Sequence, residues 1–438
     1  SEYIHIGGDE AQKDNWKQCP RCQARIQEEN LEDEEALQSY FINRIDDYLK
    51  KHGKKLMGWD ELTNGRIPDG ATIFGWRGLG HAAFDAAEEG HPFILTPARV
   101  LYLIRYQGPQ WFEPFTYFGN NTLRDVYAYE PTKEMDPDHS ELLKGIQACL
   151  WSEFVTSPED AEYLIFPRLA AFAETAWTQP DQRDWDDFLP RVDHMKNIYR
   201  KLDINLSQFS DLNLFHDVKP TGGELNVRLR SIRTDLEIRY TLDGSEPSSN
   251  DRLYEQPFQL SDAKTVRAAT FRNGKRKGEI LTLPIKQSLA MGCQVESSFS
   301  TADLLTNGLL GSEKITDGEY VDLYNTDGRF VLDMGQPKEI QKVTLSFMNN
   351  YGRNAHLPSG IVLSVSQDGE AFKVVEEIAI SEKERFKGAV RREFVNFHEI
   401  PGKVKYLKIE LDKPGPAPSN HVMAGQQARI AFDEIIVR

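Results

Sequence analysis

Short apolar runs alternate with segments of helical period in the first half of the sequence, and this alternation restricts the fold more than any other feature. The predicted strands are residues 3–6, 55–58, 72–75, 93–95 and 145–150. In the segment 33–50 between the first two, apolar residues recur every three or four positions, as on one face of a helix. Strands that alternate with helices indicate βαβ units and a parallel sheet.

Each of four predicted strands ends in a polar or aromatic cluster. The clusters are Gly7-Gly8-Asp9-Glu10, Trp59-Asp60-Glu61, Trp76-Arg77 and Trp151-Ser152-Glu153. In a β/α barrel the carboxyl ends of the strands carry the active site. One buried Trp would be ordinary core packing, but three at three strand ends predict the walls of a pocket for a flat, weakly polar ligand.

Only about five strand–helix units are visible before the pattern changes, whereas a barrel needs eight. The sequence therefore favours an α/β fold of the (β/α)8 TIM-barrel type, with the last five units present and the first three upstream of Ser1. The alternative is an open α/β sheet that truly starts here. On the first interpretation the chain is the C-terminal part of a longer protein, and the upstream segment is needed to complete the barrel.

From about residue 216 the hydrophobic period switches to two, as in residues 225–229 and 236–240. Residues 265–271 read as a strand that enters a hairpin at Asn273-Gly274. After residue 289, short strands separated by turn residues indicate a β-sandwich of jelly-roll type. The predicted domains are thus 1–215, the barrel part, 216–288, a small β-sandwich, and 289–438, the jelly roll.

Charge and composition exclude several classes of protein. The 52 Lys and Arg against 68 Asp and Glu give a net charge of −16, which repels phosphate backbones and excludes a nucleic-acid partner. No run of about 18 apolar residues occurs, so no membrane span is predicted. Four cysteines are too few for a disulfide-dense scaffold.

The strongest local signal is His5-Ile-Gly-Gly-Asp9-Glu10. Two glycines permit a tight turn just past a strand, which sets two adjacent carboxylates at its end. Adjacent acids repel one another, so enclosure would perturb the pKa of at least one, as general acid–base catalysis near neutral pH requires. The alternative is a solvated acidic turn that caps the next helix.

Cys19-Pro-Arg-Cys22 is a lone CxxC sequence. A zinc ribbon would need a second cysteine pair, which Cys149 and Cys293 do not supply, and a redox motif normally opens a helix in a thioredoxin-like setting. We therefore expect a local structural pair, reduced or bridged, and no metal.

The acidic motif resembles the signature of family 20 glycoside hydrolases, the β-N-acetylhexosaminidases, over about residues 1–210. The resemblance continues in order through Gly58-Trp59-Asp-Glu, Gly75-Trp76-Arg-Gly, Tyr102-Leu-Ile-Arg-Tyr-Gln107, Leu150-Trp151-Ser-Glu153 and Phe166-Pro-Arg-Leu-Ala-Ala-Phe-Ala-Glu-Thr-Ala-Trp177. It implies a retaining, substrate-assisted hydrolase that needs no cofactor. Its substrate would be a glycan with a terminal β-linked N-acetylglucosamine or N-acetylgalactosamine. A periplasmic or secreted location and a bacterial source fit this class.

The resemblance also assigns roles to individual residues. Glu10 corresponds to the general acid and base, and Asp9 to the residue that orients the 2-acetamido group. The other predicted substrate-binding residues are Tyr102, on the acetamido oxygen, Trp59, Trp76 and Trp151, as walls, and Glu153, on the outer hydroxyls. His5 would support the acidic pair, or it is simply a buried, hydrogen-bonded strand histidine.

One departure from the family pattern concerns substrate choice. Two residues after the pocket tyrosine the family usually has an acid that binds the 4- and 6-hydroxyls, whereas this chain has Ile104 followed by Arg105. Ile cannot accept a hydrogen bond, and the Arg fork suits a sulfate. We therefore expect tolerance of 6-O-sulfated N-acetylglucosamine, with the alternative that Arg105 pairs with a nearby acid and Ile104 merely packs.

The β-regions also resemble known modules. Tyr240-Thr-Leu-Asp-Gly-Ser-Glu-Pro247 is similar to the small β-domain that follows the barrel in bacterial hexosaminidases, and residues 289–438 resemble discoidin-like, coagulation factor 5/8 C-type modules. Such modules bind glycans through loops, here with the candidates Tyr320, Tyr324, Asn349, Asn350, Tyr351 and Arg353. The resemblance also allows a structural calcium, for which no ligand set can be read. The rival function is a catalytically inactive glycan-binding protein, which Ile104 favours and the intact acidic pair opposes.

Overall fold

The chain forms two compact units in a computed structural model that describes residues 1–262 and 264–438. Unit 1 comprises Ser1–Gln107 and Thr116–Gln208, and unit 2 comprises Gly108–Phe115 and Phe209–Arg438. The short loop Gly108–Phe115 thus packs with unit 2, although its neighbours in sequence belong to unit 1. Unit 2 contains both predicted β-domains, so the boundary proposed near residue 288 stays a prediction.

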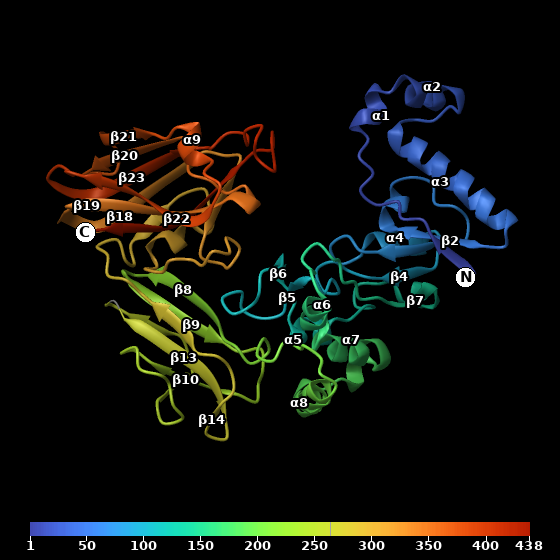
Figure 1. The fold of residues 1–438 in the computed structure, drawn as a ribbon, viewed down its shortest axis with the longest axis horizontal. Helices are drawn as coiled ribbons and strands as arrows, with labels where there is room; N and C mark the ends of the chain where they lie inside the picture. Colours follow the sequence, from blue (N-terminus) through green and yellow to red (C-terminus); the bar gives the residue numbers. More distant parts are fainter. Residues whose placement is uncertain (263) are drawn as a thin grey trace. The chain divides into compact units, whose positions relative to one another are not determined.

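Unit 1 is built on a five-stranded parallel sheet with the order β1-β2-β3-β4-β7 (Figure 1). These strands are Tyr3–His5, Lys55–Trp59, Thr72–Gly75, Phe93–Leu95 and Leu143–Ile146. Each neighbouring pair is parallel, beginning with Tyr3 opposite Lys55. The predicted parallel α/β arrangement is therefore confirmed, whereas its closure into an eight-stranded barrel stays a prediction.

The fifth strand differs from the sequence prediction, which set it at residues 145–150. The structure ends β7 at Ile146, and beyond that point the chain pairs with a different segment. The Cys149 N–H donates to the Leu101 carbonyl at 2.9 Å, and the Cys149 carbonyl accepts from the Leu103 N–H at 2.7 Å. The apolar run was read correctly as extended, but its backbone hydrogen bonds are divided between β4 and the loop that carries Tyr102.

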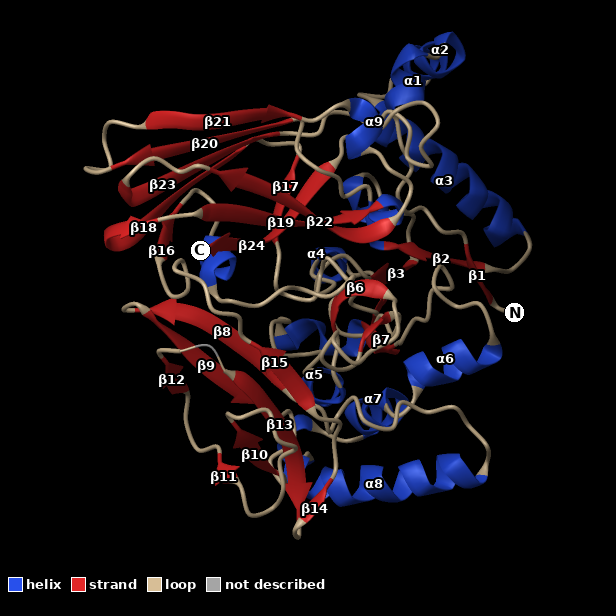
Figure 2. Ribbon diagram, turned by 60° about the vertical axis from the view of Figure 1, so that its left-hand side comes forward, coloured by secondary structure: helices blue, strands red, loops and turns tan. Residues whose placement is uncertain are grey.

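Helices follow most of the strands, as the helical pattern predicts. The longest, α3, begins at Glu34 and ends at Lys51, and the Asp33 carboxylate caps it by accepting from the Ala36 N–H at 2.9 Å. α3 packs on β2, and α4 packs on β3 and β4 (Figure 2). The helices of unit 1 are α1 Asp14–Gln18, α2 Pro20–Glu28, α3 Glu34–Lys51, α4 Ala82–Glu88, α5 Leu123–Ala128, α6 Pro158–Ile165, α7 Arg168–Trp177 and α8 Trp185–Lys201.

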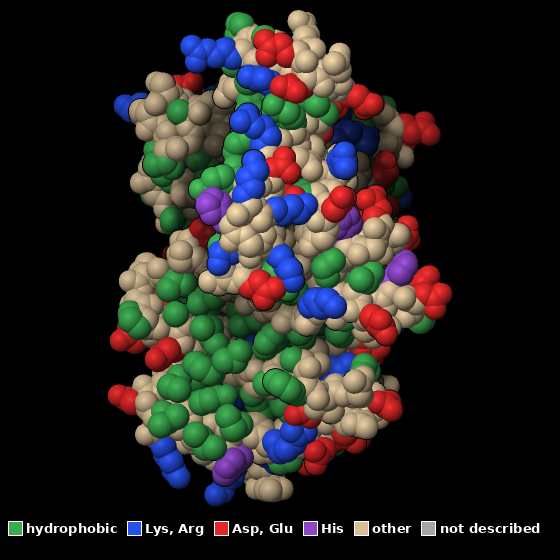
Figure 3. All heavy atoms as spheres, turned by 90° about the vertical axis from the view of Figure 1, so that its right-hand side faces the viewer, with side chains coloured by type: hydrophobic (Ala, Val, Ile, Leu, Met, Phe, Trp, Pro, Cys, Tyr) green, Lys and Arg blue, Asp and Glu red, His purple; other side chains and the backbone are tan. Residues whose placement is uncertain are grey.

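Several large apolar side chains of unit 1 are exposed. On the edge strand β1, Tyr3 is 38% and Ile4 37% exposed, and Trp177 at the end of α7 is 90% exposed. One face of the molecule gathers apolar side chains in its lower half, with charged side chains of both signs above them (Figure 3). Within the described residues, no helix combines the length and the apolar character that crossing a membrane requires.

The first part of unit 2 holds two small antiparallel sheets, of strand order β12-β9-β8 and β11-β10-β13-β14 with β15 beside β13. As the Asn273-Gly274 dipeptide predicts, both residues have positive φ and join β13 to β14 in a tight hairpin. The bounds are β8 Phe215–Thr221, β9 Glu224–Arg230, β10 Glu237–Thr241, β11 Arg252–Leu253, β12 Phe258–Leu260, β13 Thr265–Arg272, β14 Lys275–Arg276 and β15 Leu281–Pro284.

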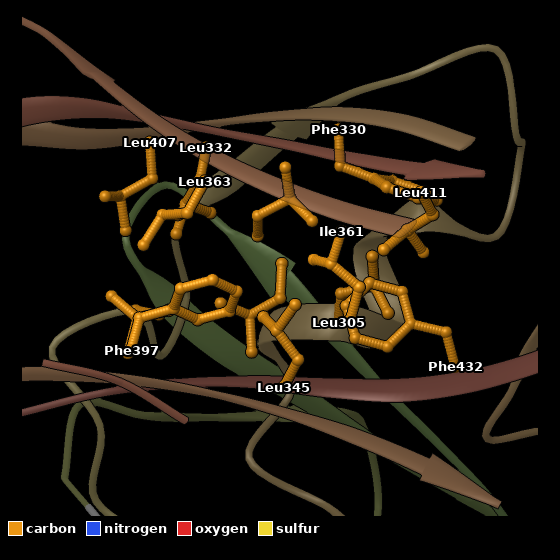
Figure 4. Close-up of a cluster of buried hydrophobic side chains, with 14 of the residues drawn as sticks. Leu305, Phe330, Leu332, Leu345, Ile361, Leu363, Phe397, Leu407, Leu411 and Phe432 are labelled. Carbon is orange, nitrogen blue, oxygen red and sulfur yellow. The ribbon is translucent and has the colours of Figure 1, made fainter. Parts of the chain in front are cut away.

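The second part of unit 2 is a two-sheet sandwich of orders β16-β18-β23-β20-β21 and β17-β24-β19-β22. Alternate side chains of both sheets point inward, so Phe330, Leu363 and Leu407 meet Leu345, Phe397 and Phe432 in one apolar core (Figure 4). The elements are β16 Gln294–Glu296, β17 Val321–Tyr324, β18 Gly328–Glu339, β19 Lys342–Asn350, β20 Gly360–Ser366, β21 Lys373–Ala379, α9 Glu382–Arg385, β22 Val390–His398, β23 Lys403–Asp412 and β24 Arg429–Val437.

Candidate active site

One pocket of unit 1, with a volume of about 360 Å³, gathers most of the residues that the sequence singles out. Its size lies at the lower end of the roughly 300–1,000 Å³ usual for small-ligand sites. The lining residues are Asp9, Glu10, Trp59, Trp76, Ala98, Tyr102, Ile104, Arg105, Tyr117, Trp151 and Glu153. Trp59 ends β2, and Asp9 and Trp76 follow β1 and β3, so the pocket lies at the carboxyl end of the parallel sheet.

The turn before the acidic pair requires glycine. Gly8 has φ +103°, and a Cβ there would lie 2.4 Å from the Leu62 side chain. Gly58 on β2 leaves room for the same side chain, because a Cβ at that position would lie 2.8 Å from Leu62. Glu10 has φ +48°, a left-handed conformation that costs a non-glycine residue roughly 1–2 kcal/mol. Such strain concentrates at functional sites, and here it sets the Glu10 side chain at the pocket.

Helix α3 holds this loop from behind. The Gln38 amide donates to the Gly8 carbonyl at 2.8 Å. The Lys13 ammonium donates to the Ala11 carbonyl at 3.1 Å and pairs with Glu35 at 3.0 Å. Both ends of the segment that carries Asp9 and Glu10 are therefore tied to a long helix, which limits the conformations of the two acids.

Aromatic rings form the pocket walls. Trp76 and Tyr102 lie nearly parallel, with an interplanar angle of 9° and ring centroids 6.1 Å apart. Trp151 approaches Tyr102 at 5.6 Å and Trp59 at 5.9 Å. Burial raises the pKa of Tyr102, so its hydroxyl stays protonated at neutral pH and can donate a hydrogen bond.

Two neighbouring acids hold Trp76 in place. The buried Asp60 carboxylate accepts from the backbone N–H groups of Trp76 and Arg77 at 3.0 and 3.1 Å, and from the Arg77 side chain at 2.7 Å. The Glu61 carboxylate accepts from the Trp76 indole N–H at 2.9 Å. Asp60 thus fixes the backbone of the wall residue, and Glu61 fixes its ring.

Arg105 lines the pocket without an acidic partner among the described residues. Its Nε donates to the Ala98 carbonyl at 2.9 Å, and its Nη1 donates to the Phe118 carbonyl at 3.1 Å. The guanidinium also lies 5.5 Å from the Tyr117 ring, and its burial lowers the pKa of Arg105. Among the described residues Arg105 thus binds carbonyls and an aromatic ring in place of the acid that the alternative expected, whereas Ile104 is buried at 2% exposure as that alternative expected.

His5 lies outside the pocket lining. Its ring packs edge-on against Trp59 and Phe74, each at 4.8 Å, and its Nδ1 accepts from the Gly7 N–H at 3.1 Å. Burial lowers the pKa of His5, which favours the neutral ring. His5 was predicted among the substrate-side residues as a support for the acidic pair, and this position suits support of the glycine turn and of the Trp59 wall rather than direct contact with a ligand.

Arg168 is a buried residue to which the sequence analysis gave no role. Its Nη1 donates to the carbonyls of Arg105 at 3.0 Å and Asn121 at 2.8 Å, and its Nη2 donates to those of Leu103 at 2.5 Å and Leu164. Arg168 thus ties helix α7 to the loop that carries Ile104 and Arg105. Its charge within an otherwise apolar helical segment is the sequence signal that could have identified it.

The structure gives less support to the two other kinds of site that were considered, a metal site and a glycan-binding site in residues 289–438. In the described residues, no three His, Cys, Asp or Glu side chains are arranged to hold a metal. Of the candidate glycan contacts in residues 289–438, Tyr320, Asn349 and Asn350 are buried, and the Tyr320 hydroxyl donates to the Ser312 carbonyl at 2.5 Å. These three side chains are buried against other parts of the domain, Tyr320 in a small apolar cluster with Met348 and Ala431, so only Tyr324, Tyr351 and Arg353 stay accessible candidates.

Parts of the chain match known protein families and relatives. Residues 1–180 match the model of the glycosyl hydrolase family 20 catalytic domain, and residues 227–285 match the Fn3-associated model. A beta-hexosaminidase of Porphyromonas gingivalis is 35% identical over 304 residues, which cover 67% of this chain and 38% of that protein. A beta-hexosaminidase of Vibrio furnissii is 36% identical over 178 residues, which cover 40% of this chain and 29% of that protein.

Among solved structures, an exo beta-N-acetylglucosaminidase of Vibrio harveyi, determined in complex with N-acetylglucosamine, is 33% identical to this chain. The match covers 47% of this chain and 33% of that one, with a TM-score of 0.42. The chain therefore spans about a third of the length of the relatives that it matches.

Proposed function

We propose that this chain, whose residues 1–180 carry the catalytic-domain sequence of glycosyl hydrolase family 20, provides the acid–base site of an exo-β-N-acetylhexosaminidase. The substrate class is a glycan with a terminal β-linked N-acetylglucosamine or N-acetylgalactosamine. The observation that carries the proposal is the single pocket in which Asp9 and Glu10 meet three Trp rings, Tyr102 and Glu153. Its volume of about 360 Å³ suits one sugar ring.

The reaction needs no protein nucleophile. The 2-acetamido oxygen of the sugar attacks the anomeric carbon while Glu10 gives a proton to the departing glycosidic oxygen, which yields an oxazolinium ion. Glu10 then takes a proton from a water molecule that attacks the same carbon, and the configuration is retained. Asp9 accepts from the acetamido N–H, which aims the oxygen and stabilises the positive charge that develops.

The remaining pocket residues orient the sugar. Tyr102 donates its hydroxyl hydrogen to the acetamido oxygen, and burial keeps that hydrogen in place. Trp59, Trp76 and Trp151 enclose the acetamido methyl and the apolar face of the ring, and their contacts exclude water. Glu153 accepts from the outer hydroxyls, and its exposed position at the mouth suits that contact.

Turnover of an aryl β-N-acetylglucosaminide by the complete protein tests the proposal. Glu10→Gln should lower kcat by at least about 10²-fold, because general acid–base catalysis contributes about 10²–10⁴-fold. Asp9→Asn should lower kcat with a smaller change in KM, because its contact strengthens in the transition state. If the native protein binds N-acetylglucosamine yet cleaves nothing, it is a glycan-binding protein without catalysis, and the proposal fails.

We also propose that the pocket accepts 6-O-sulfated N-acetylglucosamine. Arg105 supports this, because two carbonyls hold its Nε and Nη1 while no described acid neutralises its charge. Arg105→Ala should lower the ratio of sulfated to plain substrate turnover by about tenfold or more, since a charge-assisted hydrogen bond contributes about 1.5–3 kcal/mol. An unchanged ratio would refute the sulfate contact and leave the hydrolase proposal intact.

For residues 289–438 we propose a discoidin-like accessory domain in a periplasmic or secreted protein. The two-sheet sandwich supports the fold, and the exposed Tyr324 ring, on which the Arg429 guanidinium packs at 5.3 Å, offers an apolar platform for a sugar. Tyr324→Ala should weaken retention of the complete protein on immobilised glycan while small-substrate turnover is unchanged. Cell fractionation tests the location.

A further inference from the structure

The Cys19-Pro-Arg-Cys22 sequence lies at the start of a helix. Cys19 is the residue that precedes α2, Pro20–Glu28, and Cys22 is the third residue of that helix. Residues three apart on one helical turn have Cβ atoms about 5–6 Å apart. Small adjustments close that gap to the roughly 3.5–4.5 Å of a disulfide. The pair therefore has the helix-opening position that the sequence alone did not establish.

The two thiols differ chemically. The pKa of the Cys19 thiol is lowered because the Cys22 backbone N–H, the Cys22 thiol and the Arg21 backbone N–H all face its sulfur. The pKa of Cys22 is raised, mainly because its thiol shares its hydrogen with Cys19 and also because Glu34 lies nearby. Such an arrangement makes the first cysteine the nucleophile and the second the resolving thiol.

The other two cysteines are expected to react more slowly than Cys19. Cys19 and Cys22 are half-exposed. Cys149 is buried and shares a 3.0 Å contact with the Thr96 hydroxyl. Cys293 is partly exposed, as Cys19 and Cys22 are, but burial raises the pKa of its thiol, whereas the pKa of Cys19 is lowered. Thiolate character and access together decide thiol reactivity, so the chain carries two internal reference cysteines of low expected reactivity.

We propose that Cys19 and Cys22 form a redox-active dithiol that exchanges with low-molecular-weight disulfides. The Cys19 thiolate attacks one sulfur of the small disulfide, which forms a mixed disulfide and releases one small thiolate. Cys22 loses its proton to solvent, and its thiolate attacks the Cys19 sulfur and releases the second small thiolate. The protein dithiol is thus oxidised by two electrons, and the small disulfide is reduced by the same two.

This site is independent of the proposed hydrolase pocket. Asp9 and Glu10 lie on the loop between Gly8 and Lys13, and Gln38 and Glu35 of α3 hold that loop near both ends, before α1 and α2 begin. The Gln23 side chain, one residue after Cys22, donates to the Trp16 carbonyl at 3.0 Å and to Glu34 at 2.9 Å. The bridge would therefore stabilise the α1–α2 corner and leave the pocket geometry unchanged.

Oxidised glutathione tests the proposal on the complete, pre-reduced protein, with acid quenching and peptide mass mapping. The native protein should form the Cys19–Cys22 disulfide, and an excess of reduced glutathione should open it again. Cys22→Ser should trap a glutathione adduct on Cys19. In Cys19→Ser, an adduct on Cys22 should form at least about tenfold more slowly, because the raised pKa leaves less thiolate at neutral pH.

Ser is a favoured residue before a helix, so Cys19→Ser should keep the fold, which an unchanged circular dichroism spectrum confirms. Equal adduct rates at the two positions would overturn the assignment of Cys19 as nucleophile. Adducts that form first on Cys149 or Cys293 would refute the site itself. A bridge that no ratio of reduced to oxidised glutathione opens would mean a structural disulfide, and the proposal would be wrong.

Discussion

The indole N–H of Trp76 donates a 2.9 Å hydrogen bond to the carboxylate of Glu61, which lies two residues past the end of β2. The two residues come from adjacent strand ends, and only Trp76 lines the pocket. Because Trp76 also lies parallel to Tyr102, this bond sets the distance between two walls. Glu61 is therefore a positioning residue, one step removed from the substrate.

Glu61→Ala should lower kcat/KM of the complete protein by about tenfold. The loss leaves the Trp76 N–H without its acceptor, which costs about 1–2 kcal/mol, and 1.4 kcal/mol corresponds to a factor of ten. Glu61→Gln keeps an acceptor oxygen and should retain most of the activity. Steady-state kinetics of both variants measure kcat/KM. Equal losses of kcat/KM in the two variants would show that the hydrogen bond to Trp76 does not determine the activity.

Gly8→Ala should destabilise unit 1 more than Gly70→Ala does. Both glycines have positive φ, +103° and +77°, but a Cβ at Gly8 would lie 2.4 Å from Leu62 and one at Gly70 would meet nothing within 4 Å. Gly70→Ala therefore measures backbone strain alone, roughly 1–2 kcal/mol. Urea unfolding midpoints give the difference, and equal values would argue against the clash with Leu62.

Arg168→Met should lower the free energy of unfolding by about 3–5 kcal/mol and also impair turnover. The change removes hydrogen bonds to four carbonyls, including those of Leu103 and Arg105, and buried acceptors without donors cost about 1–3 kcal/mol each before relaxation. Arg168→Lys restores the charge but not the planar fork, so it should recover only part of the stability. Thermal melts and kinetics well below the melting temperature separate the two effects.

Acidification should destabilise unit 2 through His356. Its Nε2 lies 3.2 Å from His421 Nε2, and its Nδ1 lies 3.0 Å from the Asn349 amide oxygen. The Met423 N–H donates to His421 Nδ1, so the network assigns an Nε2–H to His421 and an Nδ1–H to His356. The pKa of His356 is lowered to about 4, mainly by burial and to a smaller extent by the neighbouring His421.

The unfolded chain takes up this proton near pH 6.5, and the folded chain only near pH 4. The stability contributed by neutral His356 is therefore complete above pH 6.5 and is lost progressively as the pH falls from 6.5 to 4, by about 3 kcal/mol in all. Urea midpoints between pH 7.5 and 4.5 measure the loss, and His356→Phe should flatten it. A parallel decline in both proteins would assign the pH dependence to other groups.

Several features of the fold and of the site could be predicted from the sequence, because they depend on residues that are close together in the chain. Alternation of apolar runs identified the parallel sheet, because each strand must bury both faces between helices. Asn273-Gly274 identified a hairpin, because the turn needs two residues that tolerate positive φ. Gly7 and Gly8 before Asp9 and Glu10 indicated a strand-end turn that presents two acids, and the three Trp residues at strand ends indicated one pocket.

Long-range contacts decided the rest. Nothing local to Arg105 says whether an acid faces it, and only the packing of Ala98 and Phe118 shows carbonyls there instead. Hydrophobic period alone could not end β7 at Ile146, because the chain stays extended to Cys149, where its backbone hydrogen bonds pass from β4 to the segment that carries Leu101 and Leu103. Asp60, Glu61 and Arg168 position the pocket through partners 4 to 65 residues away, and such pairs exist only once the chain has folded.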